Sequence, residues 1–528
     1  MWVSSAVGRD GKVYFSPCHS SNILIIEPTT NNVTKVATGY RCPDHREHSN
    51  SEGNWTDVAL GPDGRMYFAP GDANDILIFD PVTGAVTLVD TGAEGVSKWS
   101  AVVTASDGLM YFSPRSARDI LILDPADNHT SRIAAGDHGE DKWNALIEGP
   151  NGAIFFCPED APDILVFEPT TARVSRIPTG EDKYNKYSGV TQGPDERLYF
   201  CPFSADDILI LDTVNLDVTR IATNEEGDMK WSGVAQGPDG RIYFCPHNAS
   251  HILILDPKTE AVIAIPTGEA GLSGKWIDVA AGLDGRMYFC PHTASDVLIL
   301  EPTTNRITNV ATNEPCMGKW DSVVAGPDAQ MYFCPYNAPN VLIVDCLRRV
   351  VRNRKRTIGD ALGASGIDMW ASRAFCDGVV TVVYGSLEVE IPIHRCVLHA
   401  ASPVLRAAFT SEHSEGRTGR LEITDAGAAV VEEFLKALYT GELDVTKVDP
   451  RAIFMLAHKY EVPTLVEQCS YSLCEQLAGA SCTAAEAVET LRLLRRYDED
   501  PLIKALHWRA VSIVQANRQL NHAVLNQI

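Results

Sequence analysis

The stretch WSGVAQGPDGRIYFCP, residues 231–246, decides how the first two-thirds of this chain fold. It opens on a tryptophan and a short apolar run, and it turns at Gly-Pro-Asp-Gly. A second apolar run follows and ends in Tyr-Phe-Cys-Pro. Proline presets φ and glycine accepts a positive φ, so the middle of the stretch favours a tight turn. The stretch therefore predicts two short antiparallel strands.

The same frame recurs with a long, nearly constant period. Its aromatic pair occurs eight times, first after 53 residues and then at every 44 or 45. Such a period predicts a repeat architecture and not a set of unrelated domains. The pairs begin at Tyr14, Tyr67, Tyr111, Phe155, Tyr199, Tyr243, Tyr288 and Tyr332.

Each repeat contains enough chain for four short strands. After Pro246, residues 251–255 and 261–265 predict a third and a fourth strand around an Asp-Pro turn. Four antiparallel strands in about 44 residues are typical of one β-propeller blade. We expect eight four-stranded blades, with seven as the alternative because the first and last repeats are imperfect. The repeat ILILDPxT resembles the short YVTN repeats of surface-layer and quinoprotein-like propellers.

A lysine precedes the first-strand aromatic in six repeats. If the first strand of a blade is the innermost, these lysines surround the mouth of a central channel. The loops between strands 2 and 3 open on the same face and carry His19, Phe203, His247, His292 and Tyr336. One interpretation is a polar and aromatic face that binds a protein target, such as an acidic peptide, or an anion. The other is that each lysine pairs with its own acidic loop and holds the blades together. The lysines are Lys98, Lys142, Lys186, Lys230, Lys275 and Lys319.

Composition narrows the classes of function. The net charge of −24 argues against a general nucleic-acid binder, which needs a basic face. No apolar run approaches the roughly 18 residues of a membrane span, and no signal peptide is predicted. The 14 cysteines are too sparse for a disulfide scaffold and indicate reduced thiols in the cytoplasm or nucleus. Five of them occupy one repeat position, Cys157, Cys201, Cys245, Cys290 and Cys334, and are expected to be small buried strand residues.

Motifs of catalysis and cofactor binding are missing from the sequence. G-x-S-x-G, H-E-x-x-H, G-x-x-x-x-G-K-[ST] and C-x-x-C do not occur. Cys42, His45 and His48 have metal-like spacing but lack an evident fourth ligand. We therefore predict no enzyme activity, no cofactor and no metal.

A basic cluster separates the repeats from the rest of the chain. It runs from Arg348 to Arg356 in an otherwise acidic protein. It is either a nuclear localisation signal or the outer strand of the last blade, 348–352, followed by a linker. The predicted domains are a propeller at 1–352, a basic linker at 353–372, an α/β domain at 373–478 and a helical extension at 479–528.

The C-terminal third changes to strands followed by helices. Residues 379–384 and 387–393 predict a β-hairpin and 394–408 a helix. A short strand is expected at 421–423, and helices at 428–439, 449–460, 462–477 and 484–497. This order is typical of a compact α/β domain with a helical tail.

These residues resemble the BTB (POZ) family. The resemblance rests on CDGVVTVVYGSLEVEIPIHRCVLHAASPVLRAAFTSEHSEG, then on LEITDAGAAVVEEFLKALYTGEL and IFMLAHKYEVPTLVEQCSYSL. The helices after it resemble a shortened BACK extension. The family implies homodimers, and many members link a recognition domain to a cullin-RING ubiquitin ligase.

The resemblance also implies roles for individual residues. Asp377 and Arg395 match the charged pair at the bottom of the BTB pocket. His394 and Ser402 match the H-x-x-x-L-x-x-x-S helix signature, which implies structural roles. The hydrophobic-x-Glu motif of cullin-binding members falls on His413-Ser-Glu415, with histidine in place of the apolar residue.

Three functions follow as expectations. The first is an adaptor that binds a protein target on the propeller and a cullin through the BTB domain. The second is an oligomeric scaffold or transcriptional co-regulator without ligase function. The third, and weakest, is a propeller-type metal-dependent hydrolase.

Overall fold

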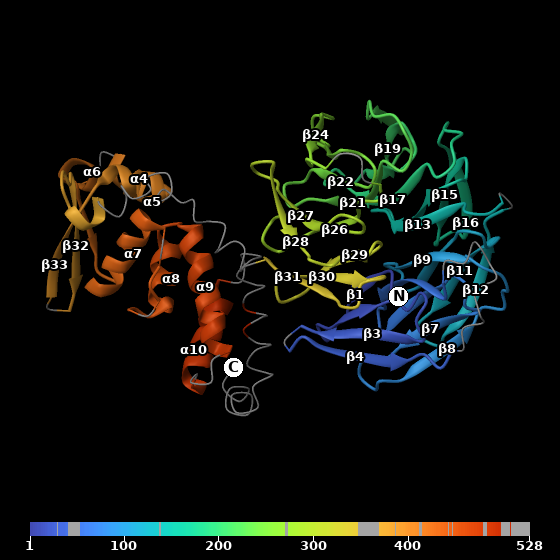
Figure 1. Ribbon diagram of the computed structural model, residues 1–528, viewed down its shortest axis with the longest axis horizontal. Helices are drawn as coiled ribbons and strands as arrows, with labels where there is room; N and C mark the ends of the chain where they lie inside the picture. Colours follow the sequence, from blue (N-terminus) through green and yellow to red (C-terminus); the bar gives the residue numbers. More distant parts are fainter. Residues whose placement is uncertain are drawn as a thin grey trace. The chain divides into compact units, whose positions relative to one another are not determined.

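The chain forms two compact units, Met1–Val344 and Asp345–Ile528 (Figure 1). The first unit ends before residue 352, the predicted end of the propeller region. The computed structural model describes residues 1–28, 30–40, 53–136, 139–269, 273–346, 369–385, 387–410, 414–441, 443–445, 447–478, 483–497, 507 and 510.

The first unit is built from short strands. Their bounds follow the predicted repeat: β1 (Ser5–Val7), β2 (Val13–Phe15), β3 (Asn22–Glu27), β4 (Asn32–Ala37), β5 (Trp55–Leu60), β6 (Met66–Pro70), β7 (Asp75–Phe79), β8 (Val86–Asp90), β9 (Trp99–Thr104), β10 (Met110–Pro114), β11 (Asp119–Asp124), β12 (His129–Ala134), β13 (Trp143–Glu148), β14 (Ile154–Pro158), β15 (Asp163–Glu168), β16 (Arg173–Pro178), β17 (Tyr187–Gln192), β18 (Leu198–Pro202), β19 (Asp207–Leu211), β20 (Val218–Ala222), β21 (Trp231–Gln236), β22 (Ile242–Pro246), β23 (His251–Leu255), β24 (Val262–Pro266), β25 (Trp276–Ala281), β26 (Met287–Pro291), β27 (Asp296–Glu301), β28 (Arg306–Ala311), β29 (Trp320–Ala325), β30 (Gln330–Pro335) and β31 (Leu342–Asp345).

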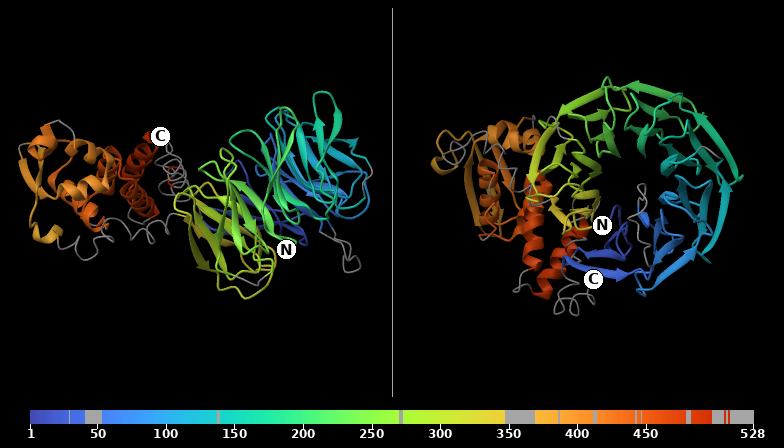
Figure 2. Two further views of the ribbon diagram at one scale, coloured as in Figure 1. Left: turned by 90° about the horizontal axis from the view of Figure 1, so that it is seen from above. Right: turned by 45° about the vertical axis from the view of Figure 1, so that its right-hand side comes forward.

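These strands form eight antiparallel sheets arranged as a ring (Figure 2, right). Within each sheet the strands neighbour one another in sequence order, so each sheet is one blade. The first strand of each blade contacts the first strand of the next, and β29 contacts β1 to close the ring. The prediction of eight blades is confirmed. Seven sheets have four strands, and the last has three among the described residues. The fourth strand expected at 348–352 lies outside those residues.

The hydrophobic core lies between blades. One cluster joins Tyr111 and Ile122 of the third blade to Trp143 and Phe156 of the fourth. An equivalent cluster joins the first blade to the last through Phe15, Tyr332 and other buried residues. Burying one large apolar side chain contributes about 1.5–3 kcal/mol. Because a blade shares its buried faces with its neighbours, the stability of each blade depends on the closed ring.

The repeated tryptophan orients this core by hydrogen bonding. Trp231 is fully buried, and its Nε1 donates to the carbonyl oxygen of His251 at the start of the third strand, at 3.1 Å. Seven blades repeat this bond, from Trp2, Trp55, Trp99, Trp143, Trp231, Trp276 and Trp320.

The tyrosine of the aromatic pair stabilises the turn before it. Tyr243 Oη donates to the carboxylate of Asp239 at 2.9 Å, inside the Gly-Pro-Asp-Gly turn. Gly240 has a φ of +79°, as the turn prediction requires. Gly237 is needed for a different reason, because a Cβ at this position would clash with the ring of Tyr243.

The repeated cysteines link neighbouring blades. Cys201 is buried, and its Sγ donates to the carbonyl oxygen of Trp231 in the next blade at 3.2 Å. Serine does the same in other blades, where Ser113 Oγ donates to Trp143 O at 3.0 Å. Burial raises the pKa of Cys201 to about 12, so this thiol stays protonated.

Tyr187 stands at the tryptophan position of the fifth blade, and its buried hydroxyl has no hydrogen-bond partner among the described residues. An unpaired buried polar group costs about 1–3 kcal/mol. We expect Tyr187→Phe to raise the free energy of unfolding by about 1 kcal/mol. The matched control is Tyr243→Phe, which removes a bonded hydroxyl and should lower it. Thermal denaturation of both variants checks this, and a larger loss in Tyr187→Phe than in the control would contradict it.

The second unit contains a small sheet covered by helices. β32 (Gly378–Tyr384) lies in the centre and pairs antiparallel with β33 (Leu387–Ile393) and parallel with β34 (Arg420–Ile423). These bounds match the predicted hairpin and strand. The helices are α4 (Arg395–Ala401), α5 (Pro403–Thr410), α6 (Ser414–Thr418), α7 (Ala428–Thr440), α8 (Pro450–Lys459), α9 (Pro463–Ala478) and α10 (Ala484–Arg496).

The single helix predicted at 394–408 is wrong, because the chain breaks it into α4 and α5. Ser402 lies between them with φ −145° and ψ 129°. A residue before proline avoids the helical region, and Pro403 follows. The side chain of Ser402 then accepts a hydrogen bond from Leu405 N at 3.0 Å and donates to Tyr460 O. The signature serine thus caps α5 and joins it to the end of α8.

Candidate functional site

One residue in each blade directly follows the proline that ends the second strand. Seven residue types occupy these eight positions, with histidine twice, although the frame around them is repeated. We call them the rim: Cys18, Gly71, Arg115, Glu159, Phe203, His247, His292 and Tyr336. His19, the residue named from the sequence for the first blade, lies one position later, and Cys18 is its rim residue.

Main-chain hydrogen bonds hold the rim in place. Lys230 N donates to Phe203 O at 2.6 Å, and His247 N donates to Lys230 O at 2.9 Å. Lys275 N then donates to His247 O, and the alternation continues to Tyr336 N, which donates to Lys319 O. From Arg115 to Tyr336, the rim residues of neighbouring blades are therefore joined through the lysine between them. Such a frame fixes the rim before any partner arrives.

The six repeated lysines are buried, with residue exposures of 1–3%. The Nζ atoms of four of them donate to main-chain carbonyls of the loops that precede them, for example from Lys98 to Gly95 O at 2.7 Å and from Lys230 to Gly227 O at 2.9 Å. The Nζ of Lys275 donates to Asn248 O at 3.0 Å. Burial lowers the pKa of Lys98 to about 8. These contacts support the loop-holding interpretation, with carbonyls in place of the expected carboxylates. Direct binding of a partner by the ammonium groups stays a prediction, and it would require the loops to open.

Aromatic and imidazole side chains occupy the rim over the last four blades. The rings of Phe203 and His247 lie 5.6 Å apart, and those of His292 and Tyr336 lie 6.3 Å apart. All four side chains are half-buried. Burial lowers the pKa of His247 and of His292, so both imidazoles are neutral at pH 7. We call these four residues the aromatic arc.

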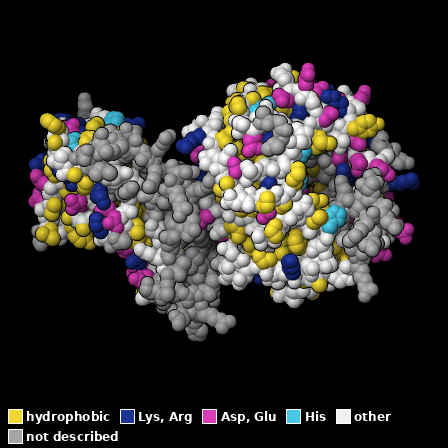
Figure 3. All heavy atoms as spheres, viewed as in Figure 1, with side chains coloured by type: hydrophobic (Ala, Val, Ile, Leu, Met, Phe, Trp, Pro, Cys, Tyr) yellow, Lys and Arg dark blue, Asp and Glu magenta, His cyan; other side chains and the backbone are white. Residues whose placement is uncertain are grey.

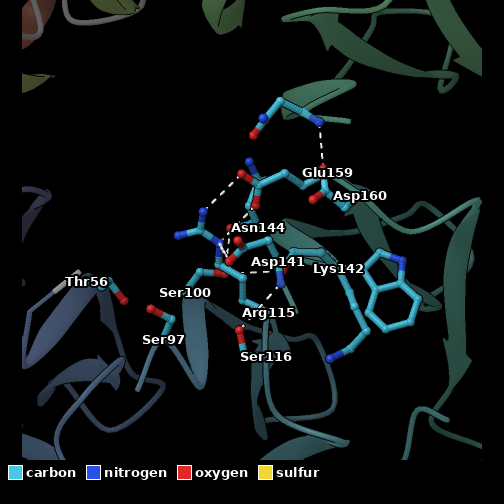
Figure 4. Close-up of polar contacts among 12 residues, drawn as sticks. Thr56, Ser97, Ser100, Arg115, Ser116, Asp141, Lys142, Asn144, Glu159 and Asp160 are labelled. Atoms are coloured by element: carbon cyan, nitrogen blue, oxygen red, sulfur yellow. Dashed lines mark hydrogen bonds and ion pairs between the residues drawn. The ribbon is translucent and has the colours of Figure 1, made fainter. Parts of the chain in front are cut away.

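A charged pair occupies the rim over the third and fourth blades. Arg115 donates to Glu159 through Nε at 2.9 Å and Nη2 at 3.0 Å, and it lies 3.2 Å from Asp141 (Figure 4). Lys142 extends away from this pair in the same view. Burial raises the pKa of Glu159 to about 7, while Arg115 opposes that shift. The pair is bidentate and satisfied, which indicates a structural link between two blades.

Three aspartates lie on first strands, where every blade but the first shows a β-bulge after its aromatic. Asp57 accepts hydrogen bonds from Ser4 Oγ and Val102 N, and Asp278 accepts one from Val323 N. Asp321 lies 3.6 Å from His292 Nδ1. Burial, and then the charge of Asp278, raise the pKa of Asp321 to about 7. Asp321 is therefore a carboxyl group beside His292 of the aromatic arc that gains its negative charge near pH 7.

The pair predicted for the BTB pocket meets through the main chain. Asp377 accepts a hydrogen bond from Arg395 N at 2.8 Å, and the guanidinium of Arg395 donates to Phe409 O at 2.7 Å. His394 is buried, and its main-chain N donates to Tyr439 Oη. Glu415 lies half-buried in α6, whereas His413 is outside the described residues, as are the basic cluster and Cys42, His45 and His48.

Metal-binding clusters and membrane-spanning helices are absent from the described residues. No group of three or more His, Cys, Asp or Glu side chains in this part of the chain is arranged to hold a metal ion. Among the same residues, no helix combines the length and apolarity that a membrane span requires.

Sequence reasoning named His247, His292 and Tyr336 but missed Arg115, Glu159 and Asp321. The signal for the first two was the position after the repeated proline, which varies from blade to blade. The signal for Asp321 was weaker. It occupies the position directly after the repeated aromatic residue, where three other blades have serine.

Comparison with known proteins places a family in the second unit. Residues 368–477 match the BTB/POZ domain model. The chain is 35% identical over 111 residues to Kelch-like protein 24 of Homo sapiens, covering 21% of this chain and 18% of that protein. It is 33% identical over 95 residues to Kelch-like protein 40 of Xenopus tropicalis, covering 18% and 16%. The matches thus span less than a fifth of the length of these relatives.

Solved structures similar to the first unit are more distant. Virginiamycin B lyase from Staphylococcus aureus shares 16% identity at a TM-score of 0.45, over 54% of this chain and 93% of that one. Hydrazine synthase of Kuenenia stuttgartiensis shares 16% at a TM-score of 0.42, over 58% and 99%. The protein therefore joins an eight-bladed propeller to a BTB/POZ domain at residues 368–477.

Proposed function

We propose that this protein is an adaptor, in which the propeller rim binds a protein target and the BTB domain dimerises and recruits a cullin-RING ubiquitin ligase. The observation that carries the proposal is the rim itself. A repeated, hydrogen-bonded frame holds residues of seven types at the eight rim positions, and the same chain carries a BTB domain. Loops that a rigid frame holds in place commonly carry the residues that bind a partner.

Dimerisation through the BTB domain would make target binding bivalent. Two rims in one particle raise the effective concentration of the second binding event. A target with two binding segments would then be held more tightly than one segment allows. The ubiquitin transfer itself would be carried out by the recruited ligase.

A non-ligase scaffold is the second candidate. The observation that favours it is His413, which stands where cullin-binding relatives carry an apolar residue. The basic cluster from Arg348 to Arg356 adds to this candidate, because a nuclear co-regulator needs an import signal. A metal-dependent hydrolase is the weakest candidate and would require a stoichiometric metal on elemental analysis.

Affinity purification of the full chain, with its mass measured by sedimentation, separates these candidates. We expect a dimer that co-purifies with a cullin. Glu415→Lys should abolish cullin recovery, whereas Glu422→Lys, an exposed reversal on β34, should retain it. A dimer without cullin would remove the ligase and leave the scaffold. A monomer without cullin would contradict both.

A further inference from the structure

The aromatic arc continues outward onto exposed apolar side chains. Tyr184, Met229 and Met317 lie in loops between blades and are 77%, 42% and 73% exposed. These loops leave a fourth strand and enter a first strand, so they open on the same face as the rim. Met229 O lies 3.3 Å from His247 Nδ1, and Met317 O accepts a hydrogen bond from Asn337, the residue after Tyr336. Met229 and Met317 are therefore neighbours of the arc.

Exposed aromatic and methionine side chains of this kind are typical of protein-binding surfaces. Tyrosine and other aromatic residues are enriched where a few side chains carry most of the binding energy. Removing exposed apolar surface from water lowers the free energy, so binding of a partner that covers these three side chains is favoured. The hydrogen-bonded main-chain frame already orders these loops, so binding costs little additional conformational entropy.

Charge decides which kind of partner fits this surface. The same loops carry the exposed carboxylates of Asp182, Glu226 and Asp228. Below the arc, Asp321 is 22% exposed beside His292. The repeated lysines beside these loops do not offer their ammonium groups, because these are buried and donate to carbonyls. Lys183, between Asp182 and Tyr184, is 38% exposed, but its ammonium group pairs with Asp206 at 2.7 Å. Figure 3 shows acidic, basic and hydrophobic side chains interspersed over the visible face of the propeller.

We propose that the aromatic arc and its apolar tips bind a basic segment of the protein target, with an arginine or lysine side chain over the arc near Asp321 and an adjacent apolar side chain against Met317. This rests on the proposed function, since it names the chemistry of the target that the rim binds. A guanidinium stacks on aromatic rings and pairs with carboxylates. An acidic segment would instead meet Asp228, Glu226 and Asp321, and like charges across an interface are repelled.

Selection from a random displayed-peptide library on the full chain tests the proposal. We expect enriched peptides that contain arginine or lysine next to an apolar residue. Their affinity should fall tenfold or more in Met317→Ser and in Asp228→Lys. Matched controls lie in the turns at the other end of the blades, where Val82 and Val214 are 93% and 86% exposed. Val82→Ser, Val214→Ser and Asp217→Lys should leave the affinity unchanged.

The outcomes separate this inference from the function on which it rests. If the enriched peptides are acidic or neutral and lose affinity in Met317→Ser, the proposal of a basic segment is wrong, but target binding at the rim still holds. Peptides that depend on Val82 or Val214 would overturn both, because the wrong face would then bind. No enrichment at all would also count against both. Asp321→Asn serves as a second variant, and unchanged binding of arginine peptides there would remove Asp321 from the site.

Discussion

Replacing Trp231 with alanine should lower the free energy of unfolding by about 3–5 kcal/mol, the usual cost of truncating a buried aromatic. The indole is fully buried in a cluster shared by the fifth and sixth blades, where it packs with Tyr199 and Ile208. Its loss leaves a cavity between blades and removes the hydrogen bond to His251 O. Urea denaturation followed by far-ultraviolet circular dichroism measures the change.

Tyr184→Ala is the matched control for this prediction, since it removes a large ring that is mostly exposed. Exposed substitutions of this kind stay within about 0.5 kcal/mol. A loss below about 1 kcal/mol in Trp231→Ala would show that the repeated tryptophan does not support the interface between blades.

Replacing Arg115 with methionine should destabilise the propeller by about 3–5 kcal/mol at about pH 8, because it leaves a buried carboxylate without its partner. Glu159 is 8% exposed and receives two hydrogen bonds from Arg115. The double variant Arg115→Met with Glu159→Gln should recover most of the loss, since the buried charge is then gone.

The loss of stability in Arg115→Met should depend on pH. Burial already raises the folded-state pKa of Glu159 to about 7, above its ordinary value near 4.5. A raised carboxyl pKa means that the folded state takes up a proton more readily than the unfolded state, so the stability of the fold falls as pH rises through that window. Without Arg115 the pKa rises further. Stability curves at several pH values should show the penalty shrinking below about pH 7, and an equal penalty at acidic pH would contradict this account.

The repeated blade was predictable because its causes are local. Strands of five or six residues, a turn at Gly-Pro-Asp-Gly and an aromatic pair lie within one repeat, so their period determines the sheets and their number. The BTB helices were predictable from their apolar spacing for the same reason. The break at Ser402 was local too, since Pro403 directly follows it, but the apolar period across 394–408 outweighed it in the prediction.

The role of the lysines and the composition of the site required the tertiary structure. A lysine before a strand has the same sequence signal whether its ammonium group faces water or a carbonyl. In the folded protein Lys98 and Lys230 are buried, and their Nζ atoms also donate to Asp72 O and Ser204 O, which belong to the strand 2–3 loop of the preceding blade. Likewise His292 and Tyr336 are 44 residues apart in sequence, and Asp321 lies between them. Closing the ring brings these side chains together, because residues at one repeat position become neighbours only when the blades pack around a common axis.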